Sequence, residues 1–487
     1  MASGLPDYVA SAKPVPQENR MPWFKSTAQT YAGIMLWFVF WQDVPVGQNI
    51  NPAAGEFSAF AGGTLSQGLG VALFGLILAA LICHFLFYLV PGMLGLKTGL
   101  PLYIVGTSTY GVNGGFLMPG FLMGVLQFGW LAVNAYFSAM LLAGTFGLAA
   151  NSPAHLAIGV IWAVVAAFVG LKGIQYVAKV ATFLPLIPLV ILAVLLVATI
   201  GGIGSFDPQA AVQAGASKVV ELETGTLQAG PALSTLGVIG VICAYVVGFF
   251  ATAGAAGCDF GMNNRDAKDV QLGGLVGIAL ATIVAGGVSL IAVAGAQGLG
   301  KAGGDLAVLR TSMLMGPILT PQVAKIFMFL LAIAAFPPAC FSSLIAANSF
   351  KTTLPKVNPF ITCGLGTAGS IALVVSGYAG DAAGVFTIIG ASFGPVCGAM
   401  AADYLLAGKK WAGPRAGFNP AGWISWIIGF AVGAFNFIPG KPFVMPCPPV
   451  AAFIVGFVLY LLLAKAGMES RVLEMPTGDA APKPAAE

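Results

Sequence analysis

Charged residues are scarce in this chain. They make up 8% of its 487 residues, whereas 58% are hydrophobic, and an average soluble domain carries about 25% charged residues. With a mean hydropathy of +0.91, the chain has too few charges to cover the surface of a water-soluble fold. The composition therefore predicts an all-α polytopic membrane protein whose helices turn apolar faces to the lipid bilayer.

Residues that carry metal and proton chemistry are also rare. The chain has two histidines, His84 and His155, at unrelated positions, and no H-E-x-x-H motif. Its seven cysteines lie mostly inside apolar segments and lack metal-ligand spacing, which indicates buried, reduced packing residues. We therefore expect no enzyme, no metal centre and no cofactor, and we expect no nucleic-acid partner.

Long apolar runs, in contrast, recur along the whole chain. A transmembrane helix needs about 20 mostly apolar residues, and the runs predict about twelve helices in a single transmembrane domain over 28–465. Residues 1–27 are predicted to form an N-terminal tail without a cleavable signal peptide, and the Pro- and Ala-rich residues 466–487 a disordered tail. The predicted spans are 28–45, 68–94, 116–146, 155–171, 177–203, 234–256, 272–298, 322–350, 360–378, 382–406, 421–438 and 447–465.

The few cations distinguish the two sides of the membrane. An even number of spans puts both tails on one side, and that side collects most of the Lys and Arg residues. By the positive-inside rule we expect both termini in the cytoplasm and the protein in the plasma (inner) membrane. The cations on the terminal side are Lys13, Arg20, Lys25, Lys97, Lys172, Lys179, Arg265, Lys268, Lys351, Lys356, Lys409, Lys410, Arg415, Lys465 and Arg471, against Lys218, Lys301, Arg310, Lys325 and Lys441 on the other.

Two spans are interrupted at matching places. The first is interrupted at 41–47, which includes Pro45 and Gly47, and the sixth at 248–254, which includes two glycines. Transporters built from inverted repeats bind substrate at such breaks near the middle of the membrane. The spacing fits repeats of five helices each, over about 28–203 and 234–406, with two extra helices in 421–465. Close packing of Gly-rich helices is the alternative explanation.

Three motifs resemble one family. The first motif consists of three segments, G-L-K-T-G-L-P at 95–101, T-Y-G-V-N-G-G at 109–115 and Q-F-G-W-L-A-V-N at 127–134. The second motif is A-A-G-C-D-F at 255–260, and the third is G-P-V-C-G-A-M-A-A-D-Y at 394–404. In this order and spacing they resemble the nucleobase:cation symporters, which include purine and cytosine permeases and allantoin and hydantoin transporters. The cytosine-permease branch is the most similar. The resemblance implies a LeuT-like fold with broken helices one and six, alternating access, and import coupled to H⁺ or Na⁺.

Candidate substrate residues lie in the third and sixth spans. A flat heterocycle needs an aromatic face to stack on and polar groups that read its edge. Gln127, Trp130 and Asn134 share one helical face, and the resemblance implies stacking on Trp130 and edge recognition by Asn134. It also places a second aromatic at Phe250, beside Gly248, whose backbone could be exposed. The alternatives are an amide that bonds a neighbouring helix and a phenylalanine that only packs.

Candidate residues for the coupling ion lie in the first and eighth spans. A charge inside a span costs about 2.5–3.5 kcal/mol or more, so Asp43 is expected to bind a cation, take up a proton or pair with the substrate, with Gln42 beside it at the substrate. The alternative places Asp43 in the outer loop. In the eighth span, Pro337 and Pro338 occupy about the place of the family's sodium-binding hydroxyl pair.

The two serines that follow these prolines complete the site prediction. Ser342 lies near a substrate-reading asparagine of the family, and Ser343 is a candidate ion ligand. Our hypothesis is that protonation of Asp43 replaces the lost sodium site. The coupling ion, the heterocycle and the oligomeric state stay open. A channel, a non-transporting ligand sensor and a symporter for another small solute such as a vitamin are the alternative functions.

Overall fold

The computed structural model describes residues 5–47, 60–172, 184, 186–216, 219–222, 225–228, 230–302, 310–354 and 356–475. Positions 177–183 of the predicted fifth span and positions 476–487 of the predicted tail lie outside these residues. Nine helices in this part of the chain are long and apolar enough to cross a membrane, and two shorter apolar helices accompany them. Together with a broken first helix they account for the twelve predicted spans.

The helices begin and end close to the predicted positions. The first span is α2 (Thr27–Met35) with α3 (Phe38–Gln42), and π-helical turns join α4 to α5 and α15 to α16. The other spans are α4 (Leu69–Ile82) with α5 (Leu89–Thr98), α8 (Leu122–Thr145) after the π-helical turn Phe116–Phe121, α9 (Pro153–Lys172), α11 (Leu186–Thr199), α13 (Thr235–Ala255), α15 (Ala267–Gly274) with α16 (Ala281–Gly298), α18 (Pro321–Ala334) with α19 (Phe336–Thr353), α20 (Pro359–Val375), α21 (Ala382–Leu406), α22 (Pro420–Gly433) and α23 (Pro448–Lys465).

Short elements occupy the two ends of the bundle. Helix α12 and an antiparallel hairpin, in which Val219 of β1 lies opposite Gln228 of β2, are the largest of them. The short elements are α1 (Asp7–Ala10), α6 (Leu102–Val105), α7 (Thr107–Tyr110), α12 (Pro208–Ala216), β1 (Val219–Leu222), β2 (Gly225–Gln228), α14 (Gly257–Gly261) and α17 (Met315–Ile318).

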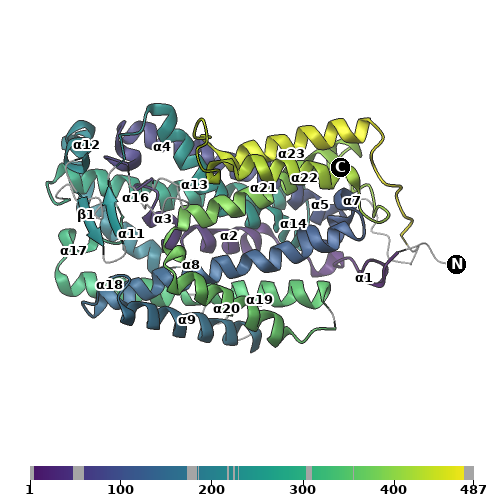
Figure 1. The fold of residues 1–487 in the computed structure, drawn as a ribbon, viewed down its shortest axis with the longest axis horizontal. Coiled ribbons are helices and arrows are strands. Elements are labelled where there is room, and N and C mark those ends of the chain that lie inside the picture. Colours follow the sequence, from purple (N-terminus) through teal and green to yellow (C-terminus); the bar gives the residue numbers. More distant parts are fainter. Residues whose placement is uncertain are drawn as a thin grey trace.

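The long helices run along one direction, and both chain ends lie at the same end of the bundle (Figure 1). We call this end the terminal end and the opposite one the far end. Helices α8, α9, α19 and α20 pack together on one side, α21, α22 and α23 on the other, and α2 and α13 lie between them. Large apolar side chains such as Phe74 (59% exposed), Val197 (77%) and Leu365 (72%) cover the outside, which suits lipid and not water.

Polar residues begin several helices as capping rules predict. Asn358 precedes Pro359 and accepts from the amide of Phe360, and Thr320 precedes Pro321, so each proline occupies the first helical position, where no amide donor is needed. Asp381 caps α21 by accepting from the amide of Gly384 at 2.8 Å. Thr320 and Asp381 satisfy backbone donors at the far end and Asn358 does so at the terminal end, where the helices leave the membrane.

The two tails pack against the terminal end. In the N-terminal tail, Arg20 donates to the carbonyl of Leu96 at 2.9 Å. In the C-terminal tail, the amide of Ser470 donates to Asn419 Oδ1 at 3.0 Å and the amide of Leu473 to the carbonyl of Pro414 at 2.7 Å. The tail predicted to be disordered from residue 466 is therefore ordered up to residue 475, because it completes a polar network.

Arg415 is the centre of that network. Its guanidinium donates to Asp403 at 2.9 Å and to Glu469 at 2.7 Å, and the Arg415 and Asp403 side chains are each 6% exposed. Ser108 and Thr109 also donate to Asp403. The third sequence motif thus carries a carboxylate that ties α21 to α7 and, through Arg415, to the C-terminal tail.

Replacing Arg415 by alanine is expected to destabilise the protein strongly. Removing one partner of a buried pair leaves the other charge uncompensated, which costs about 3–5 kcal/mol. Arg265→Ala is the matched control, because Arg265 pairs with Asp269 while 50% exposed, and such pairs contribute about 0–1 kcal/mol. Thermal unfolding in detergent measures both variants, and equal losses would contradict the structural role of the network.

The pH dependence of stability is expected to report Asp381, which lies just before the membrane-spanning part of α21. Burial and the nearby charge of Asp43 raise the pKa of Asp381 from 3.8 to about 6. The folded state therefore binds more protons than the unfolded state between these values. Stability should fall as pH rises through this window, by at most about 1.4 kcal/mol per pH unit. The difference between the unfolding temperatures at pH 5 and pH 7 should be smaller in Asp381→Asn, in which the side-chain amide oxygen can still cap α21. A difference as large as in the natural protein would contradict this assignment.

Candidate functional site

Helix one is broken, but not where its sequence pattern predicted. Residues 38–42 are helical, and the chain is extended at Trp37, with φ −64° and ψ 127°. The predicted break at 41–47 is therefore wrong in position: Pro45 and Gly47 follow the end of α3. At the true break Trp41 Nε1 donates to Leu36 O at 3.0 Å, and at the end of α3 the hydroxyl of Tyr245 lies 2.8 Å from Val39 O and 3.0 Å from Phe40 O.

Helix six is interrupted later than predicted. Helix α13 continues through 248–254 to Ala255, and the chain turns at Ala256 before α14. A Cβ on Gly248 would lie 2.6 Å from the carbonyl oxygen of Phe386, and one on Gly254 would lie 2.8 Å from Phe87 Cβ. These glycines allow neighbouring helices to approach closely. Gly248 therefore serves packing inside a continuous helix and does not lie in an unwound segment.

Six aromatic rings gather at the break of helix one, and we call them the aromatic cluster. The Trp130 ring centroid lies 5.9 Å from that of Trp37, 5.1 Å from Phe249 and 5.0 Å from Phe386. Thr252 accepts from Trp130 Nε1 at 3.2 Å. Helices one, three, six and ten thus meet here around Trp130. The cluster consists of Trp37, Phe40, Trp130, Tyr245, Phe249 and Phe386.

Two predicted substrate residues, Phe250 and Gln127, make their contacts outside the aromatic cluster. Phe250 packs on Tyr31, with ring centroids 5.7 Å apart, so its neighbour Phe249 is the residue of helix six that contacts Trp130. Gln127 is buried and donates to the sulfur of Met123 in its own helix at 3.6 Å. Sequence reasoning missed Phe249 because a one-residue difference in helical register changes the face by about 100°.

Asn134 joins three helices. Its Nδ2 donates to the carbonyl of Ala335 at 2.9 Å, and its Oδ1 accepts from Trp162 Nε1 at 3.0 Å and from Ser138 at 3.3 Å. The amide therefore holds α8 against α9 and against the turn between α18 and α19. The amide nitrogen carries two hydrogens, and the bond to Ala335 uses one of them, so one N–H remains for a ligand. The amide oxygen already accepts two bonds.

An ion pair closes the far end of helix one. Asp43 is 3% exposed and pairs with Arg310 through both carboxylate oxygens, the second at 3.2 Å. The guanidinium carbon lies 5.2 Å from the ring centroid of Phe137 in α8. Gln42 is fully buried beside this pair, and its Oε1 accepts from Ser312 at 2.6 Å. Asp43 caps the end of α3 in the turn that follows helix one, but its side chain is buried and charge-paired.

The prolines of helix eight coincide with a turn. Helix α18 ends at Ala334, α19 begins at Phe336, and Pro337 and Pro338 follow within the first turn of α19. Ser342 Oγ donates to the carbonyl of Pro338 at 3.3 Å. Ser343 is buried, its hydroxyl has no hydrogen-bond partner among the described residues, and a Cβ on Gly170 of α9 would lie 3.0 Å from the Ser343 Cβ. Its side chain thus lies against α9, and no described contact joins these serines to Asp43.

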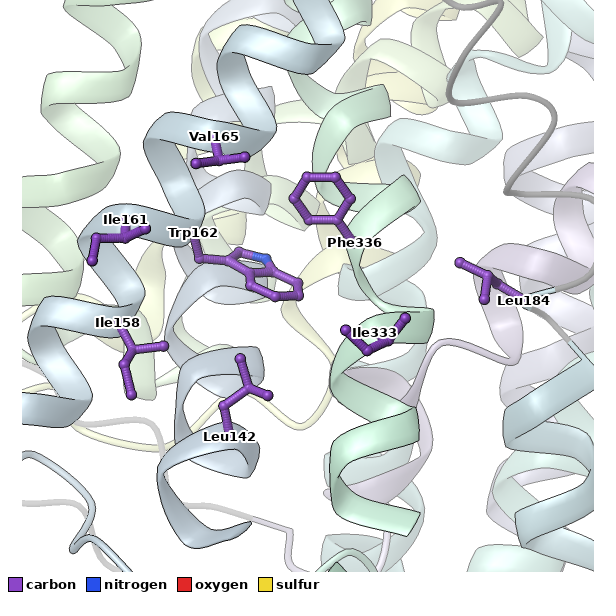
Figure 2. Close-up of a pocket in the computed structure, with 8 residues that line it drawn as sticks. All are labelled: Leu142, Ile158, Ile161, Trp162, Val165, Leu184, Ile333 and Phe336. Carbon is purple, nitrogen blue, oxygen red and sulfur yellow. The ribbon is translucent and has the colours of Figure 1, made fainter. Parts of the chain in front are cut away.

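The cavity drawn in Figure 2 is a separate feature. It has a volume of about 490 Å³ and lies between α8, α9 and the junction of α18 with α19, with Trp162 and Phe336 in its wall. Ile161 and Val165 in the same wall are 62% and 44% exposed. Its lining is apolar apart from the Trp162 indole, so it lacks the convergent polar groups of a heterocycle site. The cavity is connected to the candidate site because Trp162 in its wall donates a hydrogen bond to Asn134.

Comparisons with known proteins give a consistent picture. No family model matches the chain. Cytosine permease from Escherichia coli K12 is 25% identical over 420 residues, which cover 83% of this chain and 87% of that protein. Cytosine permeases of two other E. coli strains match to the same extent.

Solved structures share the fold over nearly the whole chain. The inward-facing conformation of Mhp1 matches with a TM-score of 0.67 and 15% identity over 96% of this chain and 94% of that one. Mhp1, a nucleobase-cation-symport-1 family transporter, in a closed conformation with bromovinylhydantoin bound, matches with a TM-score of 0.62 and 13% identity over 94% and 95%. A Na⁺-coupled sialic acid symporter in a substrate-bound outward-open state follows at 0.54 and 13% over 96% and 93%.

These relatives are a permease and symporters, not enzymes, and the solved structures confirm the predicted LeuT-like fold. The chain is a homologue of the cytosine permeases with the fold of the nucleobase-cation-symport-1 transporters, the family that its motifs resemble.

Proposed function

We propose that this protein is a secondary transporter that imports a flat, nitrogen-rich heterocycle by alternating access, together with a cation. The observation that carries the proposal is the aromatic cluster at the break of helix one, where Trp130 and Phe249 lie with ring planes at 87° to each other. A planar ring that displaces one of these contacts gains an aromatic face, and the broken helix brings polar groups within reach.

The coupling cation in this proposal is a proton. Two prolines stand where the resemblance implies sodium-binding hydroxyls, Ser342 donates within its own helix, and the Ser343 side chain lies against α9. Asp43 is the buried carboxylate at the far end of helix one, and its partner Arg310 belongs to the segment that precedes α18. Protonation of Asp43 would remove the charge that attracts Arg310 and so release this end of helix one. An opening linked to proton binding is what symport requires.

The orientation completes the proposal. Both tails lie at the end of the bundle that holds most of the cations, and we propose that this end faces the cytoplasm and that the protein resides in the plasma (inner) membrane. The far end, with Asp43 and Arg310, would then face outward. Substrate and proton would enter there and leave between the helices that the tails contact.

The two neighbouring phenylalanines of helix six provide a matched test of the site. Phe249→Ala should weaken heterocycle binding by about ten-fold, because base-aromatic stacking contributes about 1–3 kcal/mol. Phe250→Ala, which removes an equally buried ring facing Tyr31, should change affinity less than about three-fold in protein that is still folded. Calorimetric titration of both purified variants measures this difference, and a larger loss in Phe250→Ala would contradict the site.

Transport itself is tested by counterflow in proteoliposomes. Vesicles preloaded with unlabelled nucleobase should accumulate labelled nucleobase, whereas a non-transporting sensor would bind the ligand without exchanging it. A proton gradient directed into the vesicles should increase the uptake of labelled nucleobase, whereas added sodium at fixed pH should not. Asp43→Asn should abolish the response to pH, and Asp207→Asn, at an exposed acid of the far end, should keep it. Sodium-dependent uptake that persists in Asp43→Asn would refute proton coupling.

A further inference from the structure

The apolar cavity of Figure 2 reaches the outer surface of the bundle. Three residues of its wall, Ile161, Val165 and Ile333, are 62%, 44% and 37% exposed. They belong to helices that are long and apolar enough to cross a membrane, so in a bilayer these side chains face hydrocarbon. The cavity is therefore continuous with the surface that meets lipid.

The depth of the cavity decides which part of a lipid can enter it. Trp162 in its wall follows Pro153, the first residue of α9, by nine positions, which corresponds to about 14 Å along the helix. The hydrocarbon core of a bilayer is about 30 Å thick, so Trp162 lies near its middle. Headgroups stay at the membrane surface, and acyl chains are the part of a lipid that reaches this depth.

The lining offers an occupant apolar contacts. Trp162 Nε1 is the one polar side-chain atom of the described residues that line the cavity, and it already donates to Asn134 at 3.0 Å. A buried water needs about two to four polar partners, and apolar cavities of about 150 Å³ stay dry and bind apolar molecules. The cavity here has about 490 Å³. An alkyl chain suits both its depth and its lining.

The wall of the cavity also carries two groups that hold Asn134 from other helices. Trp162 packs edge-on against Phe336, with ring centroids 5.1 Å apart and ring planes at 85°. Trp162 donates to the oxygen of Asn134, and the carbonyl of Ala335, directly before Phe336, accepts from Asn134 Nδ2 at 2.9 Å. An occupant that packs on the two rings therefore acts on both groups that fix this amide.

We propose that an acyl chain of a membrane phospholipid occupies this cavity and, through Trp162 and Phe336, stabilises Asn134 in its observed position. Whatever stabilises the two rings in this arrangement also stabilises the hydrogen bonds of Asn134, and the reverse holds by linkage. The bilayer is then a ligand that acts on the helix that carries Trp130. The inference needs a membrane-spanning chain and not the proposed function, so failure of heterocycle binding would leave it standing.

Quenching of tryptophan fluorescence by brominated lipid tests the occupancy. The full-length protein in digitonin, a detergent without an alkyl chain, is titrated with phosphatidylcholine brominated in its acyl chains. Comparison with Trp162→Phe in each background gives the contribution of Trp162. We expect saturable quenching of Trp162, and Val165→Phe should reduce it at least about two-fold because the added ring fills the cavity. Val164→Phe is the matched control, because Val164 is 47% exposed on the same helix but lies outside the cavity wall, and it should leave the quenching unchanged.

Two outcomes of this titration would overturn the lipid site. One is quenching that does not saturate, and the other is equal quenching in Val165→Phe and Val164→Phe. Ile158→Phe fills the cavity from another position of α9 and replaces Val165→Phe if that variant fails to fold. If Trp162→Phe fails to fold, a cryo-EM map of the natural protein in lipid nanodiscs decides the question. Chain-shaped density against Trp162 and Phe336 is expected, and an empty cavity would overturn the proposal.

The link to Asn134 is tested by the same titration. Asn134→Ala removes the group that holds Trp162, so the lipid concentration at half-maximal quenching should rise by about five-fold. Thr387→Ala is the control, because Thr387 is fully buried and donates to the carbonyl of Ala383 within α21, and it should leave this concentration unchanged. The same concentration in Asn134→Ala as in the natural protein would overturn the link and leave the lipid site standing.

Discussion

Backbone groups freed inside a membrane must find partners within the protein, because the hydrocarbon core offers no water. The break at Leu36 and Trp37 is where this constraint acts most strongly here. Trp41 returns to the carbonyl of Leu36, and Tyr245 reaches across from helix six to two further carbonyls. The extended residue between α2 and α3 then presents the Trp37 indole beside Trp130. Tyr245, which belongs to the aromatic cluster, thus joins helix six to helix one next to the break.

The ends of the bundle apply the same principle to charges. At the far end Asp43 pairs with Arg310, and at the terminal end Asp403 pairs with Arg415. The two pairs differ in what surrounds them. Arg415 also bonds Glu469 and the backbone of α7, so that pair fixes a permanent junction. At the far end the Asp43 pair is accompanied by hydrogen bonds from Thr311 N to Gln42 O at 3.1 Å and from Ser312 to Gln42 Oε1 at 2.6 Å, and these contacts join helix one to the segment before α18 without reaching a chain tail.

Prediction from sequence succeeded where the signal is local and failed where it depends on distant partners. The nine long apolar helices of the described part of the chain follow from apolar length. The position of the helix-one break does not, because its stability comes from Tyr245, about 200 residues away. Pro45 and Gly47 gave a stronger local signal, but they only follow the end of α3.

The candidate site shows the same limit. Trp130 lies at the break of helix one, and which of Phe249 and Phe250 contacts it depends on the rotation of helix six. Asp43 and Arg310 pair although they lie 267 positions apart in the sequence. The oxygen of Asn134 is occupied because Trp162 of another helix donates to it. Hydrogen-bond partners of this kind decide which groups are left for a ligand, and no spacing rule in one sequence reveals them.

If a flat heterocycle binds against Trp130 at the break of helix one, titration of the purified protein with nucleobases and hydantoins should change its tryptophan fluorescence. The change should be saturable, and it should disappear in Trp130→Ala while the protein remains folded. A saturable change of the same affinity in Trp130→Ala would place the ligand elsewhere and contradict the claim.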